Sequence, residues 1–177
     1  HNTIYSANTK HLYYTNISSD PISWQAAKAS CESAILFGLK GQLTQVSSSI
    51  ENNILSWKMG KNGWIGASDA AQESAWNWVL GTVATTFWSG LNSEYGGTNL
   101  NNAYTSWEPI GIASTTGEPN NLQGDNYALM QLNGFWADRP NYDPSIRVFF
   151  CEFGSDSAPV PGYVFGASTL QRSGCTY

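Results

Sequence analysis

Apolar residues near the start of the chain recur with the spacing of an α-helix. Trp24, Ala27 and Cys31 lie three or four residues apart, so they share one face of a helical turn pattern. A residue that can cap the helix precedes them, either in Asp20-Pro21 or at Ser23. The pattern predicts an amphipathic helix that packs its apolar face on the core.

A second helix is indicated by a capping box. Ser48 can accept a hydrogen bond from the amide three residues on, and the Glu51 carboxylate can reach back to the cap. Ile50, Ile54 and Trp57 then continue one helical face. We therefore expect a second core helix after residue 48.

Most of the remaining pattern has the two-residue period of β-strands. In residues 76–79, for example, Trp76 and Trp78 fall on the same face. Asn133-Gly134 is typical of a type I′ hairpin turn. The expected strands are an opening strand or hairpin in residues 2–14 and segments 41–46, 64–66, 76–79, 127–132, 135–136 and 147–153.

Residues 89–121 show almost no periodicity and are rich in Gly, Asn, Ser and Thr. So long a loop within a compact domain is usually functional. Two helices followed by short strands around this loop predict an α+β fold, with short antiparallel strands. We expect one domain over residues 1–153. Residues 154–177, which hold several Ser and Pro, are expected to be a linker or a packed tail.

Composition narrows the function. The 177 residues carry a net charge of −5 with only 8 Lys+Arg, which argues against nucleic-acid binding. No apolar run is long enough to span a membrane. Charged residues are 12% of the chain, so most of the polar surface must come from neutral side chains. Such a surface is typical of secreted or cell-surface proteins. Both histidines lie in the first dozen residues, and the chain has no phosphate-binding loop and no CxxC zinc pattern. We therefore expect a protein that is not an enzyme.

Oxygen-bearing side chains gather in one stretch, and such donors are the ligands that Ca²⁺ prefers. A cis peptide before Pro119 would turn the carbonyl groups of Glu118 and Asn120 toward one point. Ordinary turn chemistry is the competing interpretation, since Asp and Asn favour turns. The candidate metal ligands are Glu118, Asn120, Asp125, Asn126 and Asp138.

Several segments occur in the order found in a known family. The sequence resembles a C-type lectin-like domain, particularly the bacterial adhesin kind with an EPN motif. The segments that carry the resemblance are Trp24-x-x-Ala27-x-x-x-Cys31, Gly41 to Ser47 with Glu51, Trp64-Ile65-Gly66-Ala67-Ser68-Asp69, Glu73-x-x-Trp76-x-Trp78-x-x-Gly81, Tyr104 to Trp107, Gly117-Glu118-Pro119-Asn120-Asn121, Asp125 to Ala128, Trp136-Ala137-Asp138 and Cys151-Glu152.

The resemblance implies that the two ends of the domain meet and that a disulfide joins Cys31 to Cys151. Cys175 is then left over, for an intermolecular bond, for a partner elsewhere or as a free thiol. It also implies Ca²⁺ as cofactor and a sugar bound by Glu118, Asn120 and Asp125. Two departures weaken the ion site: Ala137 stands where the family has Asn, and Asp125 where it usually has Glu.

The resemblance therefore leads to a calcium-dependent carbohydrate-binding module of an extracellular adhesin. Its partner would be a glycan or glycoprotein with equatorial vicinal diols, as in mannose, glucose, N-acetylglucosamine or fucose. Two alternatives remain open. The same fold can serve as a calcium-independent protein- or surface-binding module, with the long loop as its contact surface. A flat-surface binder such as an ice-binding lectin relative is the other, supported by low charge and many Thr and Asn.

Overall fold

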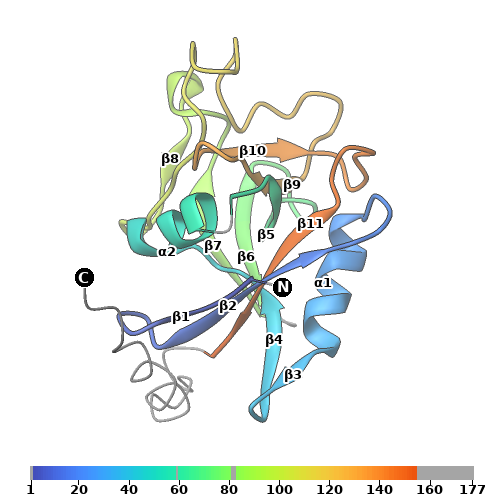
Figure 1. Ribbon diagram of the computed structural model, residues 1–177. Coiled ribbons are helices and arrows are strands. Elements are labelled where there is room, and N and C mark those ends of the chain that lie inside the picture. Colours follow the sequence, from blue (N-terminus) through green and yellow to red (C-terminus); the bar gives the residue numbers. More distant parts are fainter. Residues whose placement is uncertain (1, 59, 81–82, 155–177) are drawn as a thin grey trace, which may run out of the picture.

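The computed structural model describes residues 2–58, 60–80 and 83–154. The predicted α+β architecture, with two helices and a long structured loop, is confirmed (Figure 1). The helices are α1 (Trp24–Ser33) and α2 (Ser49–Asn53), followed by a π-helical turn at Ile54–Lys58 and, further on, a 3₁₀ turn at Ser93–Tyr95. The strands are β1 (Asn2–Ser6), β2 (His11–Ile17), β3 (Ile35–Leu36), β4 (Leu39–Leu43), β5 (Gly63–Ser68), β6 (Ala75–Leu80), β7 (Val83–Ser89), β8 (Thr98–Asn99), β9 (Tyr127–Met130), β10 (Trp136–Arg139) and β11 (Val148–Phe153).

One sheet runs through the molecule in the order β1-β2-β11-β5-β6-β7-β8. The prediction of antiparallel strands is wrong for one pair, since β11 runs parallel to β5, and the sheet is therefore mixed. The last described strand, β11, pairs antiparallel with β2 near the start of the chain, with Phe150 opposite Thr15. The two ends of the domain therefore meet, as the resemblance implied. The β9–β10 hairpin attaches to β5, and the long loop lies beyond β10 at the top of Figure 1, away from the β1–β2 hairpin.

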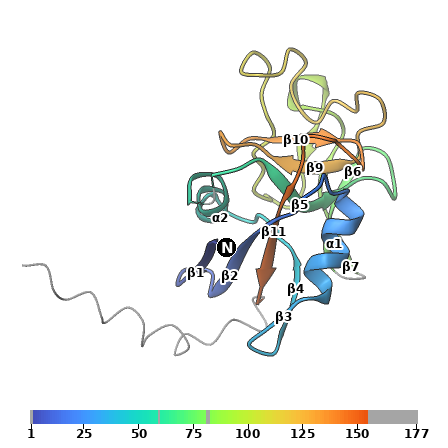
Figure 2. The ribbon, with the colours of Figure 1, turned by 45° about the vertical axis from the view of Figure 1, so that its right-hand side comes forward.

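The first helix agrees with its prediction. Ser23 is the N-cap, since its hydroxyl accepts a hydrogen bond from the Ala26 amide, and Trp24, Ala27 and Cys31 are buried. Figure 2 shows α1 lying beside β4.

The second helix begins as predicted but turns a different face inward. Ser48 is the N-cap and accepts from the Glu51 amide. Ile54 is buried, whereas Ile50 is 43% and Trp57 77% exposed, so the predicted Ile50-Ile54-Trp57 face is wrong. The π-helical turn from Ile54 adds a residue to that turn and rotates Trp57 away from the core. It does not account for Ile50, which precedes it in the first turn of α2.

The predicted type I′ turn at Asn133-Gly134 is also wrong. A type I′ turn needs a positive φ at both central residues, and here Gly134 has φ 86° while Asn133 is not in that region. The Asn133 side-chain oxygen instead accepts a hydrogen bond from the Phe135 amide, a local contact that favours an ordinary turn before the glycine.

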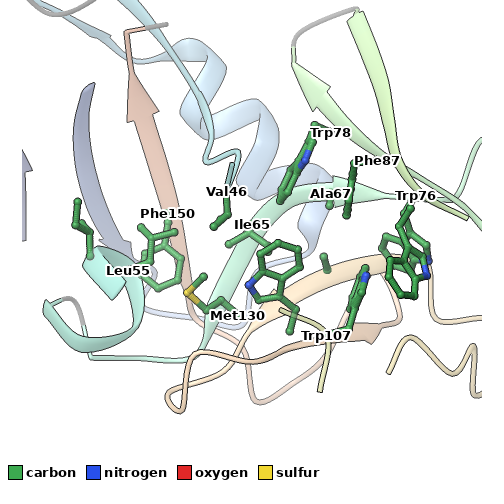
Figure 3. Packing of buried hydrophobic residues seen from close by; sticks show 14 of the residues in the cluster. Val46, Leu55, Ile65, Ala67, Trp76, Trp78, Phe87, Trp107, Met130 and Phe150 are labelled. Carbon is green, nitrogen blue, oxygen red and sulfur yellow. The ribbon is translucent and has the colours of Figure 1, made fainter. Parts of the chain in front are cut away.

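The core consists of two apolar clusters on the two faces of the sheet region. The larger one holds most of the aromatic rings, and Figure 3 shows Trp76, Trp78, Phe87 and Trp107 grouped at one end of it. The smaller cluster packs α1 on the sheet and contains the predicted disulfide between Cys31 and Cys151, whose Cα atoms are 5.4 Å apart.

The last described strand, β11, ends at Phe153. The domain boundary expected after this residue stays a prediction. Residues 155–177, which include Cys175, lie outside the described residues. In the part of the chain that is described, none of the helices has both the length and the apolar character needed to cross a bilayer.

Candidate functional site

Backbone hydrogen bonds fix the long loop to the edge strand β10. The Trp136 amide donates to the Ser106 carbonyl at 2.7 Å, and the Glu108 amide donates to the Trp136 carbonyl at 3.0 Å. The Glu118 amide then donates to the Glu108 carbonyl at 2.8 Å. The segment that contains Glu118 is therefore held beside β10 by the sheet's own hydrogen-bonding groups.

Asp138, on β10, lies at the centre of the predicted site and is fully buried. Its carboxylate accepts hydrogen bonds from the backbone amides of Asn120, at 3.1 Å, and Asn121, at 2.7 Å. The peptide bond between Glu118 and Pro119 is cis. The EPN segment thus wraps around a buried carboxylate contributed by a strand.

Glu118 and Asn120 lie side by side. The Asn120 side-chain amide donates to Glu118 Oε2 at 2.7 Å, and Asn120 Oδ1 accepts from the Leu122 amide at 2.9 Å. The second of these bonds fixes which end of the Asn120 amide faces Glu118. A carboxylate acceptor and an amide donor are consequently presented next to one another.

A cavity of about 400 Å³ opens over this pair. Glu118, Asn120 and Asp125 line it together with Arg139, whose Nη1 is 3.9 Å from Glu118 Oε1. The structure thus brings Glu118, Asn120 and Asp138 into direct contact and places Asp125 in the same cavity.

Asn126, the fifth predicted ligand, does not line that cavity. Its backbone amide donates to the Arg139 carbonyl at 3.1 Å, and its carbonyl accepts from the Asp69 amide at 3.2 Å. Asn126 Oδ1 is buried and has no hydrogen-bond partner among the described residues. The backbone of Asn126 is thus paired with that of Asp69, outside the lining of the cavity.

Asp69 is a candidate ligand that the sequence analysis did not select. It follows β5, is 2% exposed, and has a buried Oδ1 without a hydrogen-bond partner in the described part of the chain. Asn121 Oδ1 has the same property. In the sequence, Asp69 could have been noticed because it follows the Trp64-Ile65-Gly66 strand. A single Asp at the end of a strand is, however, too common to be selected as a ligand on that ground.

The ionisation of these acids is perturbed by a shared cause. Burial raises the pKa of Glu118 to about 9, and its hydrogen bond to Asp138 and the charge of Asp138 act in the same direction. Burial and the Asp138 charge likewise raise the pKa of Asp125 to about 6. Burial raises the pKa of Asp69 to about 7, with the charges of Glu73 and Asp138 adding to the rise.

These shifts predict how stability depends on pH without bound metal. Each carboxyl binds its proton more tightly in the folded chain than in the unfolded one, where the ordinary values are 3.8 for Asp and 4.5 for Glu. The free energy of unfolding should therefore fall as pH rises from about 4 toward about 9. Glu118 contributes to the part of that fall above pH 7, and so does Glu152, because burial also raises the pKa of that carboxyl.

Urea unfolding in a chelating buffer at pH 5, 7 and 9 measures this trend. The Glu118→Gln variant should show a smaller decline between pH 7 and 9 than the parent, and should keep the decline below pH 7. A midpoint that rises with pH, or a variant with the parental slope, would contradict the assignment.

The residues at this site fit a calcium ion. Buried carboxylates that repel one another and three buried oxygens without partners are costly unless a cation neutralises them. Glu118, Asn120 and Asp125, which line the cavity, and Asp138, which contacts Asn120, would hold the ion. Asp69, Asn121 and Asn126 carry the three buried oxygens without partners in the described part of the chain. The bound ion would supply open positions that accept neutral oxygen ligands.

Two further residues near the site, Ala137 and Glu108, have other roles in the structure. Ala137 is fully buried, with its strand partner Leu129 on β9, and adds no oxygen to the site. Glu108 lines the cavity beside Glu118, and its carboxylate is taken up by the Ala113 amide at 2.9 Å and the Gln131 side chain at 2.7 Å.

Comparison with known proteins places this geometry in a family. The model of the Lectin C-type domain matches residues 20–152. Halomucin of Haloquadratum walsbyi is 35% identical over 142 residues, which is 79% of this chain and 1% of that protein. The chain thus corresponds to a very small part of that much longer relative.

Solved structures of low identity share the fold. The cow C-type carbohydrate-recognition domain of CD23, determined in the presence of a GlcNAc2Man3 oligosaccharide, is 24% identical, with a TM-score of 0.60 over 85% of this chain and 91% of that one. A calcium-independent type II antifreeze protein is 21% identical, with a TM-score of 0.55 over 86% of this chain and 95% of that one. The chain therefore belongs to the family of lectin C-type domains, which are non-enzymatic binding modules.

Proposed function

We propose that this chain is a calcium-dependent carbohydrate-binding module of an extracellular or cell-surface protein, such as an adhesin. The observation that carries the proposal is the group of buried acids around Asp138. Glu118, Asp125 and Asp138 are 5%, 8% and 0% exposed. Arg139 is the basic residue among those that line the cavity with Glu118 and Asp125. A divalent cation would offset this excess of negative charge.

Glu118 and Asn120 together would determine which sugars bind. A bound calcium accepts two neighbouring hydroxyl oxygens, while the carboxylate accepts a hydroxyl proton and the amide donates to a hydroxyl oxygen. One amide proton of Asn120 is already used on Glu118, which leaves the second for a ligand. This arrangement suits the equatorial vicinal diols of mannose, glucose or N-acetylglucosamine, or comparable diols of fucose.

An extracellular location is supported by the bridge between Cys31 and Cys151, because disulfides persist in oxidising compartments. The halomucin match is consistent with this location. The glycan or glycoprotein partner would then lie on another surface. A contact between chains through Cys175, which lies outside the described residues, is part of the proposal.

Calorimetry with calcium, followed by glycan-array binding with and without chelator, tests the proposal. We expect calcium uptake and a glycan signal that the chelator removes. Asp138→Asn should abolish both, whereas the exposed Asp20→Asn should change neither. Exchanging the donor and acceptor in the double variant Glu118→Gln, Asn120→Asp should shift binding toward galactose-type diols.

A calcium-independent binding module is the second candidate, and Arg139 favours it. Its guanidinium lies near Glu118 and offsets part of the negative charge without an ion. In addition, Ala137 provides no ligand for calcium. The calcium-independent antifreeze protein shows that the fold itself does not require calcium. Glycan or protein binding that ignores the chelator, with no heat of calcium binding, would replace the first proposal by this one.

A further inference from the structure

A second cluster of ligand-type side chains lies away from the cavity, at the start of β2. His11 of β2, Glu51 of α2 and Glu152 of β11 each offer one ligand atom, and these atoms all lie within 4.8 Å of one another. The three residues are 7%, 2% and 2% exposed. In Figure 1 β2 and the end of β11 occupy the lower half of the molecule, opposite the long loop.

The fold fixes this cluster by strand register and by a helix cap. Glu152 stands opposite Tyr13 in the β2–β11 pair, and His11 is two residues from Tyr13, so all three project from one face of the sheet. His11 Nδ1 and Glu152 Oε1 form an ion pair. Glu51 arrives from the first turn of α2, where Ser48 is the N-cap.

Hydrogen bonds from neighbouring residues orient the carboxylates of Glu51 and Glu152, mainly through their Oε2 atoms. Glu51 Oε2 accepts from the Ser47 amide at 2.7 Å and from both neighbouring serine hydroxyls, while Glu51 Oε1 accepts from the Tyr13 hydroxyl at 2.9 Å. Glu152 Oε2 accepts from the Gln45 amide at 3.1 Å. Each carboxylate is therefore oriented while its Oε1 keeps a lone pair. Metal-binding carboxylates in proteins are commonly oriented by such outer hydrogen bonds.

The charges of the cluster do not balance. Two buried carboxyl groups face one imidazole, so when both are ionised even a protonated His11 leaves one negative charge, and burial raises the pKa of Glu152 against that state. A divalent ion bound to neutral His11 would offset both carboxylates. We propose that His11, Glu51 and Glu152 bind a first-row transition-metal ion of the zinc class, at a site separate from the lectin cavity.

The imidazole nitrogen of His11 favours a zinc-class ion over calcium. Zinc takes nitrogen and carboxylate ligands at roughly 2.0–2.2 Å in a four-coordinate arrangement, with ligand atoms about 3.4 Å apart, which the cluster can reach with small movements. Calcium prefers six to eight oxygens, and this buried set provides two carboxylates and one nitrogen. Three protein ligands leave the fourth position for water. The ion would join β2, α2 and β11 and so stabilise the fold.

The test uses metal-free chain in which the second histidine and the third cysteine are removed by His1→Ala and Cys175→Ser, with excess Ca²⁺ present to occupy the carboxylates around Glu118. We expect one equivalent of Zn²⁺ to bind, the melting temperature to rise with Zn²⁺ concentration, and Co²⁺ to give visible absorption bands of a four-coordinate site. Ca²⁺ at the same concentrations should not compete with Co²⁺.

His11→Gln should weaken Zn²⁺ binding more than about 100-fold and remove the Co²⁺ bands. Glu152→Gln, which keeps the shape of the side chain, provides the second variant if His11→Gln folds poorly. The exposed Glu94→Gln should bind Zn²⁺ as the parent does. Zn²⁺ binding retained in both ligand variants, absent Co²⁺ bands in the parent, or equal competition by Ca²⁺ would overturn the proposal. None of these outcomes depends on calcium or sugar binding at Glu118.

Discussion

Replacing Cys31 and Cys151 together by alanine is expected to lower the free energy of unfolding by about 5 kcal/mol. The bridge joins α1 to β11 across a sequence separation of 120 residues. In the chain-entropy model, a cross-link that closes so long a loop removes many conformations of the unfolded chain. Both cysteines are 1% exposed or less, so alanine is chosen because it leaves no buried hydroxyl without a partner.

Urea unfolding of the double variant and the parent measures this effect, with the change in midpoint read at an unchanged slope. Cys175→Ser is the matched control, since it removes one cysteine and leaves the bridge intact. Its midpoint should equal that of the parent. A double variant that unfolds at the parental midpoint would show that the loop is restricted in the unfolded chain by something other than the disulfide.

Local patterns were sufficient to predict elements whose cause is local. Helix α1 follows from the spacing of Trp24, Ala27 and Cys31, and the start of α2 from the Ser48 cap. The exposure of Trp57 could not be predicted, because it depends on a π-helical turn that the apolar period does not reveal. The turn before Phe135 also differs from its prediction. There the side-chain oxygen of Asn133 accepts a hydrogen bond from the Phe135 amide.

The candidate site was predictable only where its residues are close in sequence or match a family motif. The sequence analysis selected Glu118, Asn120 and Asp138, and the structure places them in contact. The role of Asp69 depends on its unpartnered oxygen, which only the folded chain shows. The cluster at His11 was missed for the same reason, because its members are far apart in sequence and match no zinc spacing.

Truncating Trp136 to alanine is expected to destabilise the fold by about 3 to 5 kcal/mol, through lost apolar burial and the cavity left behind. The ring is fully buried and makes edge-on contacts with Trp78 and Trp107, each at a centroid distance of 5.6 Å. Its indole N–H also donates to Asn52 Oδ1 at 2.8 Å, so truncation leaves a buried acceptor without a partner. This places the expected loss toward the upper part of the range.

Trp57→Ala is the matched control, because it removes the same side chain at a position that is 77% exposed. It should change the free energy of unfolding by less than about 0.5 kcal/mol. Trp136→Ala should also weaken ligand binding at the cavity, since Trp136 anchors the long loop through Ser106 and precedes Asp138 by two residues. If both variants unfold at the same urea concentration, the aromatic cluster around Trp136 does not hold β10 and the loop together, and the placement of Asp138 must depend on the β9–β10 ladder alone.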